Sequence, residues 1–253
     1  MKLNLYSPKR IDRAVPGLIF IHGGGWSSGS RDDYHFYGVK FAERGYVVAS
    51  VSYRLAPNHP FPAAVHDVKC AVRWMRSSAA KLHVNPDRIG VVGGSAGGHL
   101  AMMIGYSSDV HELEGTGGHA GISSRVNAVV NFYGPTDLTT PFAANNKTVI
   151  NFIGGKKIDD ARNQFELASP ITHVTKDDPP TLIFHGTIDD IVPIAQADLL
   201  AKKLESLGVP HRYDRLKGWP HGLDLAEVVN RRCLRLMTGF LQKHLQVAKD
   251  PEP

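Results

Sequence analysis

The sequence lacks the features that would place this chain in a membrane or around a metal cluster. Nowhere do about eighteen apolar residues run together, the length that a membrane-spanning helix needs. Cysteine occurs only twice, at Cys70 and Cys233, without the C-x-x-C spacing of a metal or redox site. Both fall on the apolar stripe of a predicted helix, which is typical of a buried, inert thiol. The cysteines therefore indicate neither a metal site nor a cellular compartment.

A targeting signal is also missing from the start of the sequence. No charged segment followed by an apolar stretch and a small-residue cleavage site is present. The chain begins almost at once with a strand-like segment, Leu3 to Tyr6, which is consistent with removal of an upstream piece. The localisation therefore stays open between the cytosol and a secreted mature form.

No basic patch interleaved with aromatic residues indicates nucleic-acid binding. The 29 Lys and Arg residues exceed the 24 Asp and Glu residues by five, but they are spread along the chain. The densest group, Arg231, Arg232 and Arg235, lies on a C-terminal segment whose apolar residues repeat with helical spacing, and most of it faces away from that stripe. We expect a solvated helix face there and no nucleic-acid partner.

The chain does contain a regular alternation of apolar strand-like runs and periodic helical segments. Its 253 residues, 42% of them apolar, show no repeat, so one domain over residues 1–253 is expected. Helices are predicted behind Pro62 and Pro193. The alternation predicts an α/β fold: a mostly parallel sheet, helices on both faces and functional loops at its carboxyl edge. The predicted strands cover residues 17–22, 46–53, 89–93, 126–133, 181–185 and 211–216.

Two segments interrupt this alternation. Residues 109–125 are rich in Gly, His and Ser and are predicted to form a loop. Residues 138–169 hold short apolar groups among polar residues. We expect this second segment to be a small lid inserted into the domain, which would supply contacts to a substrate.

The most informative motif is a serine that stands between glycines. Gly93, Ser95 and Gly97 form a G-x-S-x-G pattern directly after an apolar strand-like run and directly before a helix-permissive one. That context is the one required by a nucleophile elbow, a sharp strand-to-helix turn with a strained serine backbone. Glycine is needed on both sides because larger side chains would collide with the strand behind the turn. We therefore predict that Ser95 is a catalytic nucleophile.

A serine hydroxyl is a weak nucleophile, so it needs a base and a carboxylate that orients the base. Residues 181–193 read TLIFHGTIDDIVP, an apolar strand followed by Asp189 at the carboxyl edge of the sheet. His221 lies in a loop bounded by Gly and Pro after the last predicted strand. We predict Asp189 as the carboxylate and His221 as the base. Asp190 is the alternative acid, although the H-G-x-x-D spacing favours Asp189.

Two other polar residues near these positions have simpler structural explanations. His185 ends a buried strand, so we expect it to be a structural hydrogen-bonding residue. Asp224 precedes the final helical segment, and an aspartate there is predicted to be the N-cap of that helix.

A glycine triplet follows the first buried strand, where residues 20–29 read FIHGGGWSSG. Glycines at a strand end allow the main chain to approach a reacting atom closely. The N–H groups of Gly24 and Gly25, with that of Ala96, are expected to stabilise the negative charge that acyl transfer builds on a carbonyl oxygen. The triplet lacks the Lys-Ser/Thr of a phosphate-binding loop, and no G-x-G-x-x-G marks a dinucleotide site. No cofactor and no metal are expected.

Four ordered motifs resemble those of a known family: HGGGW, YRLAPNHPFPAAVHD, NPDRIGVVGGSAGGHLA and HGTIDDIVP. Together they are similar to α/β-hydrolase esterases of the hormone-sensitive-lipase type and to related bacterial esterases that include feruloyl-esterase-like enzymes. Many hormone-sensitive-lipase relatives carry Asp before the nucleophile and a long N-terminal cap. Here that position is Gly94 and 21 residues precede His22, which favours the smaller bacterial group.

The resemblance implies an α/β-hydrolase fold, with Ser95, Asp189 and His221 as a catalytic triad. It implies a serine carboxylesterase that acts on short acyl or aryl carboxylic esters. The alternatives are an acetyl-xylan or feruloyl esterase that acts on plant polysaccharides and, behind it, an arylformamidase or a peptidase. A non-catalytic ligand receptor is disfavoured because no triad member is missing. Substrate contacts are expected from four residues that would also suit a core: Trp26, Phe142, Phe152 and Leu223.

Overall fold

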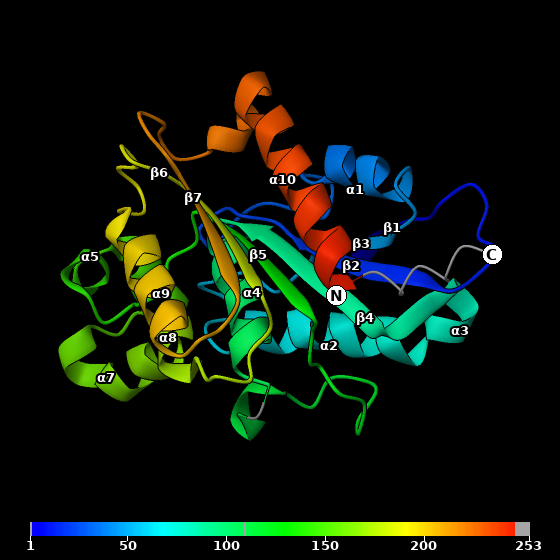
Figure 1. Ribbon diagram of the computed structural model, residues 1–253. Coiled ribbons are helices and arrows are strands. Elements are labelled where there is room, and N and C mark those ends of the chain that lie inside the picture. The colour runs from blue at the N-terminus through cyan, green and yellow to red at the C-terminus, as the bar shows by residue number, and fades with distance from the viewer. Residues whose placement is uncertain (1, 109, 246–253) are drawn as a thin grey trace.

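The computed structural model describes residues 2–108 and 110–245, and these form one seven-stranded sheet (Figure 1). The strand order is β1-β3-β2-β4-β5-β6-β7. The edge strand β1 runs antiparallel to β3, and all other neighbours are parallel. The prediction of a mostly parallel sheet is confirmed. The strands are β1 (Lys2–Tyr6), β2 (Val15–Ile21), β3 (Val47–Ser52), β4 (Val84–Gly94), β5 (Ala128–Phe132), β6 (Thr181–Gly186) and β7 (His211–Leu216).

Burial explains why the central strands read as continuous apolar runs. Every residue of β5 and β6 is buried, because helices cover both faces of the sheet at these positions. At the sheet edge, β7 mixes exposed and half-buried residues and ends in the buried Leu216. The long strand β4 brings its last residue, Gly94, to the carboxyl edge, where the first turn of the next helix begins.

Two layers of helices cover the sheet (Figure 1). One face carries α1 (His35–Ala42) and α10 (Glu227–Leu245), whose buried side chains share an apolar cluster with β2, β5 and β6. The other face carries α2 (Ala63–Ser77), α4 (Ala96–Tyr106) and α9 (Ala195–Ser206) over a second cluster. The helices predicted behind Pro62 and Pro193 are α2 and α9.

The basic residues of α10 lie on its solvent side, as predicted. Arg231 pairs with Glu227 of the same helix, and Arg232 pairs with Asp214 of β7. Cys233 lies on the apolar face of the same helix and is fully buried, as predicted. Within residues 2–108 and 110–245, α10 and the shorter helices are not long and apolar enough to cross a membrane.

Residues 138–169 form a run of short helices between β5 and β6. They are α5 (Pro141–Ala144), α6 (Lys147–Phe152) and α7 (Ile158–Leu167), followed by α8 (Pro170–His173). Asn146 begins α6 by accepting hydrogen bonds from the N–H groups of residues 148 and 149. The apolar side chains of this run, Val149, Phe152, Ile153 and Phe165, are buried against the core.

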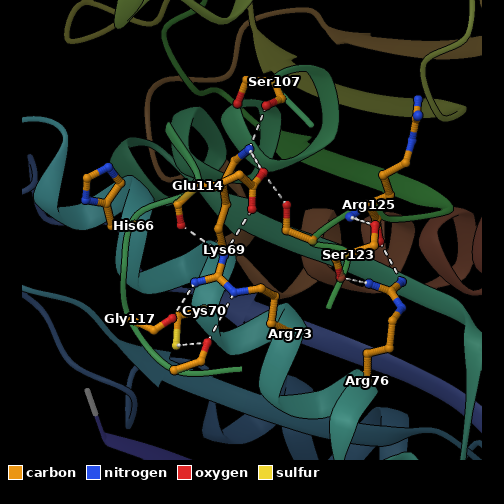
Figure 2. A network of polar contacts seen from close by, with 12 residues as sticks. His66, Lys69, Cys70, Arg73, Arg76, Ser107, Glu114, Gly117, Ser123 and Arg125 are labelled. Atoms are coloured by element: carbon orange, nitrogen blue, oxygen red, sulfur yellow. Dashed lines mark hydrogen bonds and ion pairs between the residues drawn. The ribbon is translucent and has the colours of Figure 1, made fainter. Parts of the chain in front are cut away.

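The predicted loop over residues 109–125 is observed from residue 110 onward with one short 3-10 turn, η1 (His111–Leu113); Asp109 lies outside the described residues. Buried cations of α2 hold this loop in place (Figure 2). The Nζ of Lys69 donates to Glu114 at 2.6 Å, and Arg73 donates to the other oxygen of Glu114 at 3.0 Å. Cys70 is only half-buried beneath this loop, so the prediction of a buried thiol is wrong at this position.

Candidate active site

Ser95 lies at the turn between β4 and α4 in a strained backbone conformation. Its φ of 56° and ψ of −122° are unfavourable for a residue with a side chain. A Cβ at Gly93 would lie 2.2 Å from the carbonyl oxygen of Gly97, and one at Gly97 would lie 2.0 Å from that of Ile21. Both glycines are therefore required by close packing at the turn, which presents the serine hydroxyl to a cavity.

The structure brings the three predicted catalytic side chains together in one hydrogen-bonded chain. His221 Nε2 lies 3.0 Å from Ser95 Oγ, and His221 Nδ1 lies 2.7 Å from Asp189 Oδ2. The hydrogen bond to the carboxylate keeps the proton of the neutral ring on Nδ1. Nε2 is then free to accept the serine proton. The three groups come from loops at the carboxyl ends of β4, β6 and β7.

Asp189 is fixed by the main chain of its own loop. Its Oδ1 accepts hydrogen bonds from the N–H groups of Ile191 at 3.0 Å and Val192 at 2.8 Å, which leaves Oδ2 for His221. Burial raises the pKa of the Asp189 carboxyl, but hydrogen bonds with His185, His221 and the Val192 N–H outweigh burial and hold it below its ordinary value. The carboxyl is therefore ionised at neutral pH.

The alternative acid, Asp190, is exposed to solvent and is not part of this chain of hydrogen bonds. His185 is fully buried, and its Nε2 lies 2.8 Å from the Val192 carbonyl oxygen, so its predicted structural role is confirmed. The same Nε2 lies 3.2 Å from Asp189 Oδ2, so His185 also packs behind the carboxylate.

The loop that carries His221 is bound to the loop that carries Asp189. The N–H of Thr187 donates to the Leu216 carbonyl at 2.9 Å, and the N–H of Ile188 donates to the Trp219 carbonyl at 3.2 Å. A Cβ at Gly186 would lie 2.0 Å from the Trp219 carbonyl oxygen, so the two loops approach as closely as glycine allows. This contact sets the distance between the acid and the base.

The glycine triplet after β2 lies beside Ser95. Gly24 and Gly25 have φ values of 97° and 57°, a left-handed turn that glycine adopts without strain. Within residues 2–108 and 110–245, the N–H groups of Gly24, Gly25 and Ala96 donate to no hydrogen-bond acceptor. All three residues line the cavity that Ser95 faces. The predicted oxyanion donors are thus gathered around the serine.

Trp26, the residue after the triplet, connects this loop to the helices of residues 138–169. Its Nε1–H donates to His99 Nδ1 at 3.2 Å, and its ring stacks on Phe152 at 4.4 Å. His99 Nε2 lies 2.7 Å from the Ala168 carbonyl oxygen. Burial lowers the pKa of His99 to about 4, so the ring is neutral and accepts one of these bonds while donating the other.

The cavity beside Ser95 has a volume of about 680 Å³. Of the four residues expected to contact substrate, Trp26 and Phe142 line it. Phe152 and Leu223 do not: each is 1% exposed, and they lie in the core behind the cavity wall. The expectation is therefore wrong for these two residues, whose apolar character reflects packing against Trp26 and against α10.

A cluster of tyrosines and one carboxylate forms part of the cavity wall and was not predicted. Asp224 Oδ1 accepts a hydrogen bond from the Tyr133 hydroxyl. Asn230 Nδ2 donates to the Tyr37 hydroxyl and to the Asp224 carbonyl oxygen, both at 2.8 Å. Burial raises the pKa of the Tyr37 and Tyr133 hydroxyls, so both remain protonated donors. It also raises the pKa of Asp224, despite the bond from Tyr133.

The prediction that Asp224 is the N-cap of the final helix is wrong. Asp224 belongs to a 3-10 turn, η2 (Leu223–Leu225), and α10 begins only at Glu227. Its side chain points inward to Tyr133 and away from the helix, and only 7% of its surface is exposed. Gly94, the residue before the nucleophile, packs directly against this wall. A Cβ at Gly94 would lie 2.7 Å from the Tyr34 hydroxyl oxygen.

Among known proteins, this chain is similar to several that are named esterases. The chain is 33% identical to Esterase LipC of Mycobacterium tuberculosis over 222 residues, which are 85% of this chain and 55% of the relative. The chain spans about half the length of the curated relatives it matches.

Two solved structures match nearly the whole chain. One is a truncated carbohydrate esterase from gut microbiota, with a TM-score of 0.84, 29% identity, and 96% of this chain and 90% of that chain covered. The other is esterase 2 of Thermogutta terrifontis in its apo form, with a TM-score of 0.84 and 30% identity, covering 97% of this chain and 91% of that chain. These matches agree with the α/β-hydrolase fold that the sequence motifs imply.

A family model described as BD-FAE matches residues 3–204, which contain the glycine triplet, Ser95 and Asp189. His221 and the tyrosine-facing Asp224 follow the matched stretch. Since the match covers most of the chain, this protein belongs to the BD-FAE family.

Proposed function

We propose that this chain is a serine carboxylesterase that hydrolyses short acyl or aryl carboxylic esters through an acyl-enzyme. The observation that carries the proposal is the chain of hydrogen bonds from Ser95 Oγ through His221 to Asp189, with distances of 3.0 and 2.7 Å. These lengths are those that proton transfer between a nucleophile and its base requires. The esterase names of the relatives support the same conclusion.

In the first half of the reaction, His221 Nε2 takes the proton of Ser95 Oγ as the oxygen attacks the ester carbonyl carbon. The carbonyl oxygen becomes an oxyanion, held by the N–H groups of Gly24, Gly25 and Ala96. When the intermediate collapses, the bond to the alcohol oxygen breaks and the imidazolium returns its proton to that oxygen. The alcohol leaves, and the acyl group stays on the serine.

In the second half, water takes the place of the alcohol. His221 removes a proton from the water, whose oxygen attacks the acyl carbon, and the same N–H groups hold the second oxyanion. Collapse releases the carboxylic acid and returns the proton to Ser95 Oγ. Asp189 stays ionised throughout, keeping the proton of the neutral ring on Nδ1 and stabilising the imidazolium.

Covalent labelling and kinetics of one variant test this proposal. The wild-type protein should gain the mass of one fluorophosphonate group and hydrolyse p-nitrophenyl acetate. A Ser95→Ala variant should gain no mass and lose about a million-fold in turnover. Ser206→Ala is the matched control, because Ser206 is exposed on α9 and its hydroxyl donates to the Lys203 carbonyl of the same helix. Hydrolysis by Ser95→Ala at the wild-type rate would overturn the mechanism.

A second candidate is an esterase that removes acyl groups from plant polysaccharides. The structural similarity to a carbohydrate esterase from gut microbiota favours it. A substrate panel separates the two candidates: p-nitrophenyl esters from C2 to C12 beside methyl ferulate and acetylated xylan. Higher kcat/KM on the polysaccharide than on the simple esters would establish the second candidate in place of the first.

We further propose a small-molecule ester, and no nucleic acid, as the partner of this chain. Two of the arginines in the densest basic group are held in ion pairs on α10, Arg231 with Glu227 and Arg232 with Asp214. Binding to nucleic acid would have to compete with these pairs. Salt-dependent retention of the protein on immobilised duplex DNA would contradict this part of the proposal.

A further inference from the structure

The cavity beside Ser95 is acidic, although the chain as a whole carries a net charge of +5. Two carboxylate residues, Asp33 and Asp224, line it, and among its described lining residues there is no Lys or Arg. Carboxylates that line a cavity create a local field that favours a positive charge there, even where the chain as a whole carries a net positive charge. The charge distribution therefore points to the kind of substrate that binds there.

Aromatic side chains line the same part of the cavity. Tyr34, Tyr37 and Tyr133 contribute to its wall, and Phe36 lies at its mouth with 49% of its surface exposed. Aromatic rings attract cations through their negative faces, an effect that adds to the attraction of a nearby carboxylate. A wall of rings and carboxylates is the chemistry that recognises organic cations.

The position of this wall relative to His221 determines which half of an ester it meets. In the proposed mechanism the alcohol oxygen must receive the proton from His221 Nε2, so the alcohol leaves on the imidazole side of the site. The Tyr133 ring lies 4.5 Å from the His221 ring, and the Tyr133 hydroxyl donates to Asp224. Asp224 thus lies close to the departing alcohol.

We propose that Asp33, Asp224 and the surrounding aromatic residues form a subsite for the alcohol half of the ester, and that this subsite selects cationic alcohols over neutral and anionic ones. The proposal rests on the proposed esterase function. The reaction itself is unchanged: water cleaves the ester, the acid is released, and the alcohol oxygen takes its proton from His221. Asp224 acts on specificity through charge and takes no part in the bond-breaking step.

Two acetate esters of equal shape test the selection. Acetylcholine carries a quaternary nitrogen where 3,3-dimethylbutyl acetate carries a carbon atom. At an effective dielectric constant of about 20, a carboxylate about 6 Å from a unit positive charge can raise kcat/KM by up to about a hundredfold. Water at the open mouth of the cavity weakens this attraction. We expect the wild-type enzyme to show about tenfold higher kcat/KM for acetylcholine. The acetate ester of 2-hydroxyethanesulfonate should react more slowly than both.

Substitutions of the two carboxylates test the assignment. Asp224→Asn keeps the size of the side chain and should lower the ratio of the two kcat/KM values by about fivefold, toward one. The ratio is the readout because it cancels any general loss of activity. Asp33→Asn, at an exposed position, should lower it in the same direction and stays informative if Asp224→Asn fails to fold. Glu205→Gln, on the exposed face of α9, is the matched control and should leave the ratio unchanged.

The outcomes separate this proposal from the function on which it rests. A wild-type ratio of one or below, with the neutral ester hydrolysed well, would overturn the cationic subsite and leave the esterase function intact. A high ratio that survives both carboxylate substitutions would overturn the role of Asp33 and Asp224. If none of the three acetates were hydrolysed, the proposed function would fail and this proposal with it.

Discussion

Replacing Asp189 by Asn tests the hydrogen-bonded chain at the link that the structure defines most sharply. Asp189 Oδ1 accepts from two main-chain N–H groups, those of Ile191 and Val192. An asparagine at this position must place its only oxygen there, because an amide NH₂ facing two N–H donors would leave all of them unpaired. The NH₂ group of the substituted side chain then occupies the place of Oδ2 and faces His221.

This orientation reverses the tautomer of the base. An NH₂ group can only donate, so His221 Nδ1 must accept, and the ring proton moves to Nε2. Ser95 Oγ, 3.0 Å from Nε2, then faces an N–H group that cannot take its proton. Loss of the carboxylate also removes the charge that stabilises the imidazolium. In a comparable triad this change costs about 10⁴ in kcat, which corresponds to about 5 kcal/mol of transition-state stabilisation.

The assay compares kcat for p-nitrophenyl acetate in Asp189→Asn and Asp190→Asn, with thermal melts to confirm that both variants fold. We expect a loss of about 10⁴ for the first and less than about twofold for the second, because Asp190 is exposed and outside the hydrogen-bonded chain. If Asp189→Asn kept more than a tenth of the wild-type kcat while Asp190→Asn lost activity, the assignment of the acid and the tautomer argument would both be refuted.

Three further predictions concern stability. The pKa of His99 is about 4 in the fold against 6.5 in the unfolded chain, so the unfolded state binds more protons between these values and stability falls as the pH drops. Urea unfolding should show about 2 kcal/mol lost to this group between pH 7 and 5, and His99→Gln should remove that loss. Glu114→Ala removes a carboxylate that bonds to the buried Lys69 and Arg73 of α2, and it should cost about 3 kcal/mol in the same assay. Glu227→Ala breaks an exposed pair and should cost less than about 1 kcal/mol. Gly97→Ala should lower the melting temperature sharply and abolish activity, while Gly239→Ala, with open space around it on α10, should raise stability by up to about 1 kcal/mol.

The sequence predicted the parts of the site that are encoded locally. Ser95 was identifiable because the strain of its turn requires glycines two positions away on each side, so the constraint is written in five adjacent residues. The strands were identifiable because burial on both faces leaves continuous apolar runs. The position of His221 in the loop after the last strand, and of Asp189 after β6, followed from the rule that functional loops gather at the carboxyl edge of a parallel sheet.

The sequence did not separate residues that line the cavity from residues that support its wall. Trp26 and Phe152 are both aromatic and both nearly buried, and they stack on each other at 4.4 Å, yet only Trp26 reaches the cavity. Which side of such a pair faces the substrate depends on the packing of residues 138–169 against the loop after β2. That packing is a tertiary contact between distant segments, and periodicity carries no information about it.

The acidic wall was missed for a related reason, and the tyrosines of this wall account for the glycine at position 94. Asp224 looks like a helix cap in the sequence because its partner, Tyr133, is 91 positions away. Gly94 stands where many hormone-sensitive-lipase relatives carry Asp, and a Cβ there would lie 2.7 Å from the Tyr34 hydroxyl and 3.3 Å from that of Tyr133. Tyrosine hydroxyls thus fill the space that an aspartate side chain at position 94 would need. One of them, that of Tyr133, donates to the carboxylate of Asp224. In this chain the acidic group of the wall therefore comes from the turn before α10, in which Asp224 accepts a hydrogen bond from Tyr133.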